Sequence, residues 1–271
     1  MKKRFCALIN AMFSCLFLFT FIIFLSCGGG GGDGGGSTPT PTPTPVTPTY
    51  SSQDWQNLYD YNASTNNGYT IRWPSTVKTY NVYPEYFGRW AANTDGKIEF
   101  DFVSNQPSDG ISVYIGSDLP DDAVGSTLTY YYPSTGKIAR AVITIHPDHW
   151  NETEGPYILT HEAGHALGFV GHTTDGCIMD ERIGARNYIS DAVARVMTHL
   201  YSYSPHTNTK SYFLKEAIAE FPTIERDDGS TVINTPHGDY YVKKIDEEIS
   251  VIGNGPLYTG RVEPLPELKK Q

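Results

Sequence analysis

Between residues 77 and 145, apolar or β-branched residues alternate with polar ones in five short runs. Such alternation is typical of half-buried β-strands, because successive side chains of a strand point to opposite faces. A different spacing follows the first run: Tyr86, Phe87 and Trp90 recur at helical intervals, and Pro84 suits a first helical turn. The pattern therefore predicts a helix at residues 84–92 and strands at residues 77–82, 97–103, 111–115, 126–132 and 138–145.

Two further helices are expected beyond residue 150. Pro156 opens the first, which places Leu159 and Ala163 on its core side. Ser190 can cap the second, whose apolar residues between 192 and 200 form one face. The expected elements therefore follow the order strand, helix, four strands and two helices.

The C-terminal residues 205–271 show a less regular pattern. Residues 211–221 are compatible with a short amphipathic helix, and residues 231–242 with a hairpin that turns at 236–239. We expect a small extension that packs on the preceding domain, and the pattern assigns it no role.

The segment from His161 to His172 carries the most specific chemical signal. His161 and His165 are four residues apart, so on a helix they project from the same face and can bind one metal ion. Glu162 would lie beside the open coordination position, where it can take a proton from a metal-activated water. The spacing therefore predicts a catalytic zinc site.

The residues after this motif extend the signal. Gly168 follows His165 by three residues, where a helix that ends and turns back favours a residue that tolerates positive φ. His172 comes next, and Met179 ends a run that begins at Asp175. Together these residues resemble the signature of the metzincin superfamily of zinc peptidases, H-E-x-x-H-x-x-G-x-x-H followed by a methionine-containing turn. Within that superfamily the run looks most like the matrixin-type catalytic domain.

The family pattern places its third histidine three residues after the glycine, and Gly171 holds that position here. His172 therefore stands one residue later than in the family pattern. A glycine in a loop can absorb an inserted residue. The resemblance therefore implies that His172 joins the two helical histidines as the third zinc ligand, with Asp175 as the alternative ligand. It also implies that Met179 packs beneath the metal without binding it.

The resemblance covers roughly residues 69–203. It implies a domain at residues 50–204 with an α+β fold, in which a twisted mixed sheet of about five strands is joined by an active-site helix and a C-terminal helix. It also implies that the edge strand near residues 126–132 pairs with an extended protein or peptide substrate. One catalytic Zn²⁺ is expected, and some matrixins bind a structural Ca²⁺ or second Zn²⁺ in a strand loop comparable to residues 146–149, His-Pro-Asp-His.

The expected activity is that of a zinc endopeptidase. Three neutral imidazoles leave the full charge on the metal, and Glu162 would accept a proton from water and deliver it to the leaving amine. The alternative is a surface binding module that keeps the zinc fold without turnover, although a retained Glu162 favours the enzyme. A gluzincin-type site needs a glutamate about twenty residues after His165. Residues 184 and 185 are Gly and Ala, so this other class of zinc site is disfavoured.

The N-terminal residues indicate export. Three basic residues precede an apolar run that ends at Cys27. This resembles a bacterial lipoprotein signal peptide at residues 1–27, in which Cys27 carries the lipid. Gly-rich and Thr-Pro sequence then forms a linker at residues 28–49. We expect a membrane lipoprotein at the outer membrane or cell surface; an uncleaved anchor helix at residues 5–26 is the alternative.

The net charge limits the classes of binding partner, and the cysteine content limits the disulfides that can form. The chain has 20 Lys and Arg residues against 30 Asp and Glu residues, a formal charge of −10. Removal of the leader would take away three basic residues and leave a charge of −13. Such a surface repels nucleic acid. Of the four cysteines only Cys177 lies beyond the leader, so no internal disulfide is expected.

Overall fold

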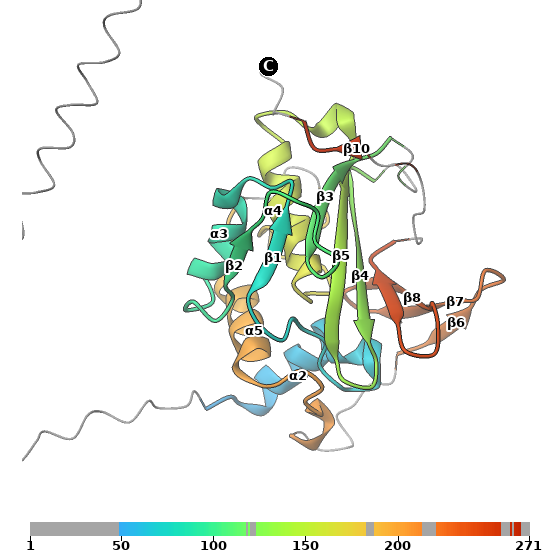
Figure 1. The fold of residues 1–271 in the computed structure, drawn as a ribbon. Coiled ribbons are helices and arrows are strands. Elements are labelled where there is room, and N and C mark those ends of the chain that lie inside the picture. Colours follow the sequence, from blue (N-terminus) through green and yellow to red (C-terminus); the bar gives the residue numbers. More distant parts are fainter. Residues whose placement is uncertain are drawn as a thin grey trace, which may run out of the picture. The chain divides into compact units, whose positions relative to one another are not determined.

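Apart from one added helix before the first strand, the elements of the computed structural model follow the expected order through the helix after Ser190, and further strands then follow in the C-terminal region (Figure 1). The structure describes residues 49–117, 119, 123–182, 187–212, 221–255, 261 and 263–266. The chain divides into Met1–Thr47 and Pro48–Gln271, and all described residues belong to the second unit. The expected signal peptide, Cys27 and nearly all of the linker lie outside the described residues, as do residues 213–220 of the expected amphipathic helix.

The five strands expected from the alternating pattern are confirmed, with small shifts of their ends. Strand β1 (Val77–Tyr80) pairs in parallel with β2 (Phe100–Phe102) and with β3 (Ile111–Ile115). β3 is also parallel to β5 (Lys137–Ile145), and β5 is antiparallel to β4 (Gly125–Tyr132). This mixed sheet and the four α-helices of the described residues make the fold α+β, as predicted.

The expected number of strands is wrong, because the described residues form one sheet of ten strands and not about five. The strand order is β2-β1-β3-β5-β4-β9-β8-β7-β6, and β10 pairs with β3 off this path. The predicted hairpin is confirmed as β7 and β8. The added strands are β6 (Thr223–Glu225), β7 (Ser230–Thr235), β8 (Gly238–Lys244), β9 (Ser250–Gly253) and β10 (Glu263–Pro264).

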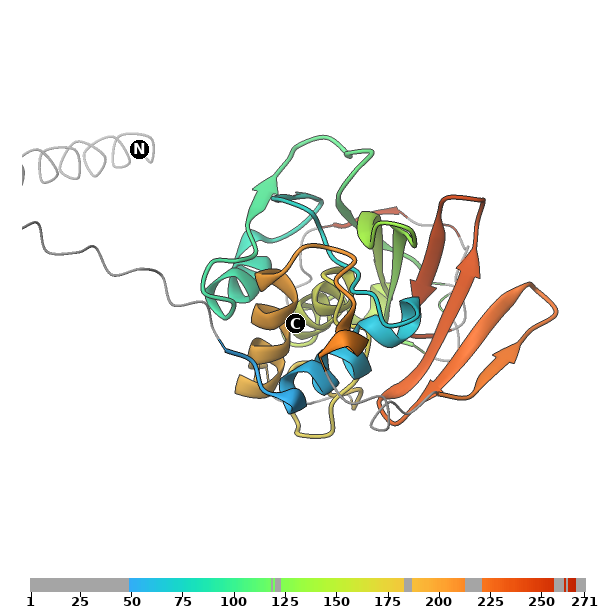
Figure 2. The ribbon, with the colours of Figure 1, turned by 90° about the horizontal axis from the view of Figure 1, so that it is seen from below.

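The C-terminal strands are continuous with the main sheet because β9 pairs antiparallel with β4 over Leu128–Tyr131. Val251 and Ile252 of β9 are each only 3% exposed, and Tyr240 of β8 is fully buried in the main core. Apolar burial therefore fixes these strands to the domain. Consequently, the expectation of a free edge along the whole of β4 is wrong: β9 covers its second half. Figure 2 shows the orange and red strands continuing the sheet on the side away from α3 and α5.

Helix α4 (Gly155–Ala166), which carries His161 and His165, packs against β4 and β5 on one side and against α3 (Pro84–Ala92) on another. Helix α5 (Asp191–Ser202) begins at the predicted cap, where the Ser190 side chain accepts a hydrogen bond from the Val193 backbone. The helices expected at 84–92, from 156 and at 192–200 are thus confirmed.

One helix, α2 (Ser52–Tyr61), is an addition to the expected elements, and it packs against α5. Its sequence does carry a start signal, since Ser51 and Asp54 form a capping box with reciprocal hydrogen bonds. Trp55 and Leu58 then supply the buried face. The helix holds the N-terminal part of the described chain against the domain.

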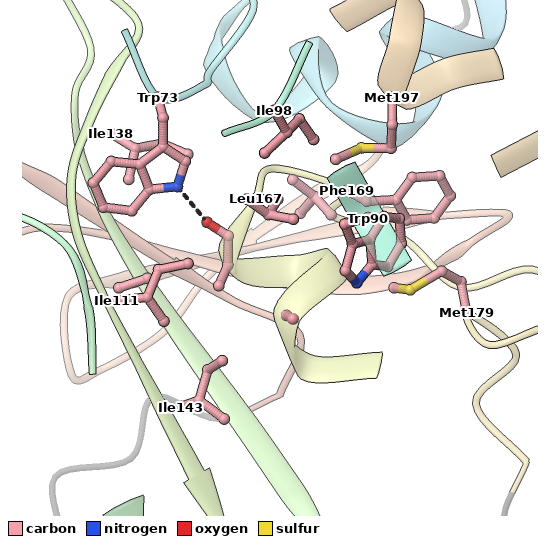
Figure 3. Close-up of a cluster of buried hydrophobic side chains, with 14 of the residues drawn as sticks. Trp73, Trp90, Ile98, Ile111, Ile138, Ile143, Leu167, Phe169, Met179 and Met197 are labelled. Carbon is pink, nitrogen blue, oxygen red and sulfur yellow. Dashed lines mark hydrogen bonds between the residues drawn. The ribbon is translucent and has the colours of Figure 1, made fainter. Parts of the chain in front are cut away.

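Two tryptophans fix α4 within the core (Figure 3). The indole nitrogen of Trp73 donates to the Ala166 carbonyl at 2.9 Å, and that of Trp90 donates to the Thr160 carbonyl at 3.0 Å. Both rings are buried, so each hydrogen bond adds direction to an apolar contact. The helix that carries the motif is therefore held at both its middle and its end.

Candidate metal centre

Helix α4 ends where the sequence predicts. Its last residue is Ala166, and Gly168 adopts φ 102°, a conformation that favours glycine. The side-chain amide of Asn62 donates to the carbonyl oxygens of Gly168 and Ile71, each at 2.7 Å. This buried amide attaches the turn to the segment that contains Ile71, so the chain leaves α4 in a defined direction.

The two helical histidines turn the same ring atom toward one another. Nδ1 of His161 donates to the Ile178 carbonyl at 2.6 Å, and Nδ1 of His165 donates to the Phe169 carbonyl at 2.7 Å. Since Nδ1 holds the proton, Nε2 of each ring keeps its lone pair. The two Nε2 atoms lie 3.1 Å apart. Both imidazoles are therefore oriented as ligands for one ion.

His172 completes the group. Its ring centroid lies 5.2 Å from that of His161 and 5.0 Å from that of His165. Ligand atoms of the three residues all lie within 4.8 Å of one another, close enough to bind a metal ion. The alternative ligand is used otherwise: the Asp175 carboxylate accepts hydrogen bonds from the Thr173 hydroxyl at 2.8 Å and the Cys177 backbone at 3.1 Å.

The C-terminal region positions the loop that carries His172. The His172 backbone donates to the His237 carbonyl at 2.9 Å. A Cβ on Gly171 would lie 2.6 Å from the Tyr240 hydroxyl and 2.7 Å from the Tyr61 ring, so only glycine fits there. The inserted glycine is thus explained by close packing against β8, and its φ is not among the positive values.

Burial keeps the three imidazoles neutral. It lowers the pKa of His161 and of His172 to about 4, and it lowers the pKa of His165 well below the ordinary value, with the other two rings adding to the effect for His165. A neutral imidazole is the form that binds a metal. The triad is therefore ready to bind at neutral pH.

Glu162 lies on α4 beside the triad and is only 6% exposed. The Thr127 hydroxyl of β4 donates to its Oε2 at 2.6 Å, and a Cβ on Gly125 would lie 2.7 Å from its Oε1. Burial raises the pKa of Glu162 to about 7, while the Thr127 hydrogen bond opposes that rise. A carboxylate with such a pKa can both accept and return a proton near neutral pH.

Met179 is fully buried and belongs to the core cluster drawn in Figure 3. A Cβ on Gly164 would lie 2.5 Å from its sulfur, so the small residue in the motif lets this side chain pack directly on the helix. Cys177 is buried and free, and its sulfur accepts from the Met179 backbone at 3.3 Å. Met179 therefore packs against the helix that carries two of the histidines.

A cleft of about 600 Å³ opens over these residues. Part of its lining comes from the first half of β4 with the preceding Ala123 and Val124, from helix α4, and from His172 and Glu181. The C-terminal region supplies the rest of its lining, namely Gly238, Asp239, Tyr241, Asn254 and Gly255. Sequence reasoning missed these residues, and it also missed Thr127 and Tyr157. Only Thr127 carried a signal, as a polar residue at an inward position of a strand.

The loop at residues 146–149, which was compared with ion-binding loops of matrixins, does not form such a cluster. Among the described residues, the only group of three close metal-ligating side chains is the His161–His165–His172 triad. His149 instead contacts Glu154, with Nδ1 3.1 Å from Oε2. In the part of the chain that the structure describes, no helix is long and apolar enough to cross a membrane.

Comparison with known proteins gives no family for this chain: no family model matches it, and no curated protein matches it either.

Proposed function

We propose that this protein is a zinc-dependent peptide hydrolase of the metzincin type, with His161, His165 and His172 as the metal ligands. The observation that carries the proposal is the joint arrangement of three neutral imidazoles within 4.8 Å and a buried carboxyl beside them. Three imidazole nitrogens with an open fourth position suit a catalytic zinc ion. When bound, zinc would polarise a peptide carbonyl and make a water molecule acidic.

The residues of the chain have separate roles in this reaction. The main-chain carbonyls of Ile178 and Phe169 hold the two helical imidazoles in the tautomer that leaves Nε2 free. Glu162 accepts the proton of the attacking water and passes it to the leaving amine. The Thr127 hydroxyl holds the Glu162 side chain at 2.6 Å, so the base has one orientation.

The test combines metal content with hydrolysis. Residues 49–271, purified with zinc and dialysed, should contain one zinc per chain by elemental analysis. Glu162→Gln should keep this zinc while hydrolysis of a diverse peptide mixture falls by about 10²-fold or more, as expected for loss of a general base. Glu85→Gln, an exposed position on α3, is the matched control and should leave both readouts unchanged.

Each readout can contradict the proposal. Absence of zinc after metal-replete purification would refute the proposed metal site. Hydrolysis by Glu162→Gln at the wild-type rate would move the proton-transfer role to another group. Zinc without any hydrolysis by the wild-type protein would leave the alternative, a zinc-containing surface module that binds without turnover.

A further inference from the structure

The cleft is open along only part of β4. On the side opposite β5, β9 pairs with Leu128–Tyr131, and this pairing ends at Leu128↔Gly253. Among the described residues, Gly125, Ser126 and Thr127 pair with β5 alone. These three residues line the cleft next to Glu162. An extended peptide can therefore add to the sheet only at this short segment.

The end of β9 closes this segment on one side. Because β9 is antiparallel to β4, each residue further along it lies opposite an earlier residue of β4. Continuing the register past Leu128↔Gly253 sets Asn254 level with Thr127. The Asn254 carboxamide nitrogen lies 3.0 Å from both ring nitrogens of His165, at the edge of the triad. In a peptide that runs antiparallel to β4, the residues before the scissile bond would lie at this position. The end of β9 already occupies it.

This closure is part of the folded domain. All four residues of β9 are buried, and β8 covers its other edge. Tyr240 of β8 also packs in the core that contains α4. Displacing β9 would expose this apolar surface, so a substrate has to fit the space that β9 leaves.

The charge of the cleft indicates which end of a bound peptide lies next to the end of β9. Apart from the triad and its neighbouring base Glu162, the described residues that line it include the carboxyl groups of Glu181 and Asp239 and no Lys or Arg. Such a lining attracts an ammonium group and repels a terminal carboxylate. A peptide whose amino end faces Asn254 also runs antiparallel to β4, as β5 and β9 do.

We propose that the site acts on the amino-terminal end of peptides, binding the free ammonium group beside Asn254 and cutting after the first one or two residues. This inference rests on the proposed peptidase function and narrows the endopeptidase expected from the sequence to an exopeptidase. The hydrolysis adds one water across the peptide bond and releases a short amino-terminal fragment and the shortened chain.

The test separates binding from turnover. A degenerate eight-residue peptide library is prepared with a free amino terminus, with an acetylated one, and with four added amino-terminal residues of which the first is acetylated. Zinc-loaded Glu162→Gln protein should retain the free library at least tenfold better than the other two, measured by mass spectrometry of bound peptides. Wild-type protein should release one or two residues from the free library.

Two substitutions test the side chains proposed to bind the ammonium group near the end of β9. Asn254→Ala should reduce the preference for free over acetylated peptides at least threefold, while Asn105→Ala, at an exposed loop position, should not change it. Glu181→Gln should also reduce the preference, in contrast to Glu225→Gln on the exposed strand β6. Unchanged melting temperatures would show that the fold is intact in all four proteins.

Equal retention of all three libraries would overturn the inference, as would retention of none of them. Wild-type cleavage at bonds with four or more preceding residues, at rates similar to those for chain ends, would overturn it while leaving the proposed peptidase in place. Selective retention of free peptides without wild-type hydrolysis would refute the proposed function and keep the chain-end binding site.

Discussion

Zinc binding by the triad should depend little on pH between 7.5 and 5.5. Protons compete with the metal for imidazole nitrogens, and an ordinary histidine with a pKa of about 6.5 would be about 90% protonated at pH 5.5. Three such residues would lower zinc affinity by roughly 10³-fold. Burial instead lowers the pKa of His161 and His172 to about 4, and that of His165 well below its ordinary value. Each of the first two is then only about 3% protonated at pH 5.5, so the expected loss of affinity is less than about twofold.

The same burial costs stability in acid when no metal is bound. The pKa values of His161 and His172 in the folded protein lie below the unfolded value of 6.5, so the unfolded chain takes up protons first. Their full contribution is therefore present above about pH 6.5 and is lost as the pH falls toward 4. At about 1.4 kcal/mol per pKa unit, the loss is about 3 kcal/mol for each histidine. Metal-free protein should melt at a lower temperature in acid, and bound zinc should restore it.

Both effects can be measured on one preparation. Zinc affinity is obtained by competition with a chelator whose own protonation is corrected, at pH 7.5, 6.5 and 5.5. Circular dichroism confirms that the metal-free protein is folded at each pH, and thermal melts record its stability. A loss of zinc affinity of about 100-fold or more by pH 5.5 in folded protein would refute the reasoning, because it would mean that the rings titrate as solvated histidines.

Three further predictions concern single residues. His172→Ala should weaken zinc binding by about 10²-fold or more, whereas Asp175→Ala should leave it almost unchanged, and the reverse result in a chelator competition would assign the third ligand to the carboxylate. Gly171→Ala would bring a Cβ within 2.6 and 2.7 Å of two aromatic side chains and should cost about 1–3 kcal/mol of stability in a denaturant titration. Gly88→Ala on α3 meets nothing within 4 Å and should instead stabilise by about 0.5–1 kcal/mol, so equal effects would contradict the packing argument. Cys27→Ala should release the full-length protein from membranes if that residue carries a lipid, and unchanged membrane fractionation would favour the anchor-helix alternative.

The first half of the fold can be predicted because its signals are local. Alternation indicates β1 to β5, and the helical spacing of Tyr86, Phe87 and Trp90 indicates α3 with the bounds observed. The histidines proposed as metal ligands are equally recognisable, because two of them lie one turn apart on a single helix. Gly168 indicates the end of that helix through its conformational freedom. In each case the information lies within a few consecutive residues.

The sheet beyond β4 cannot be predicted in this way. The sequence predicts the hairpin of β7 and β8 but not its partner, since β9 is four residues long and pairs with residues more than a hundred positions earlier. Nothing local determines which edge such a strand will pair with. The position of Asn254 is hidden for the same reason: it reaches His165 only because β9 pairs with β4.

The shifted position of the third histidine depends on contacts with the C-terminal region. With one extra residue, the loop after α4 needs a fixed support to bring His172 to the other ligands. That support is the hairpin of β7 and β8: the His237 carbonyl accepts the His172 backbone hydrogen bond, and Tyr240 fills the space beside Gly171. The hairpin is in turn held by β9, whose pairing with β4 closes one end of the cleft. The C-terminal strands that pack around the inserted glycine are therefore the same strands that contribute to the lining of the cleft.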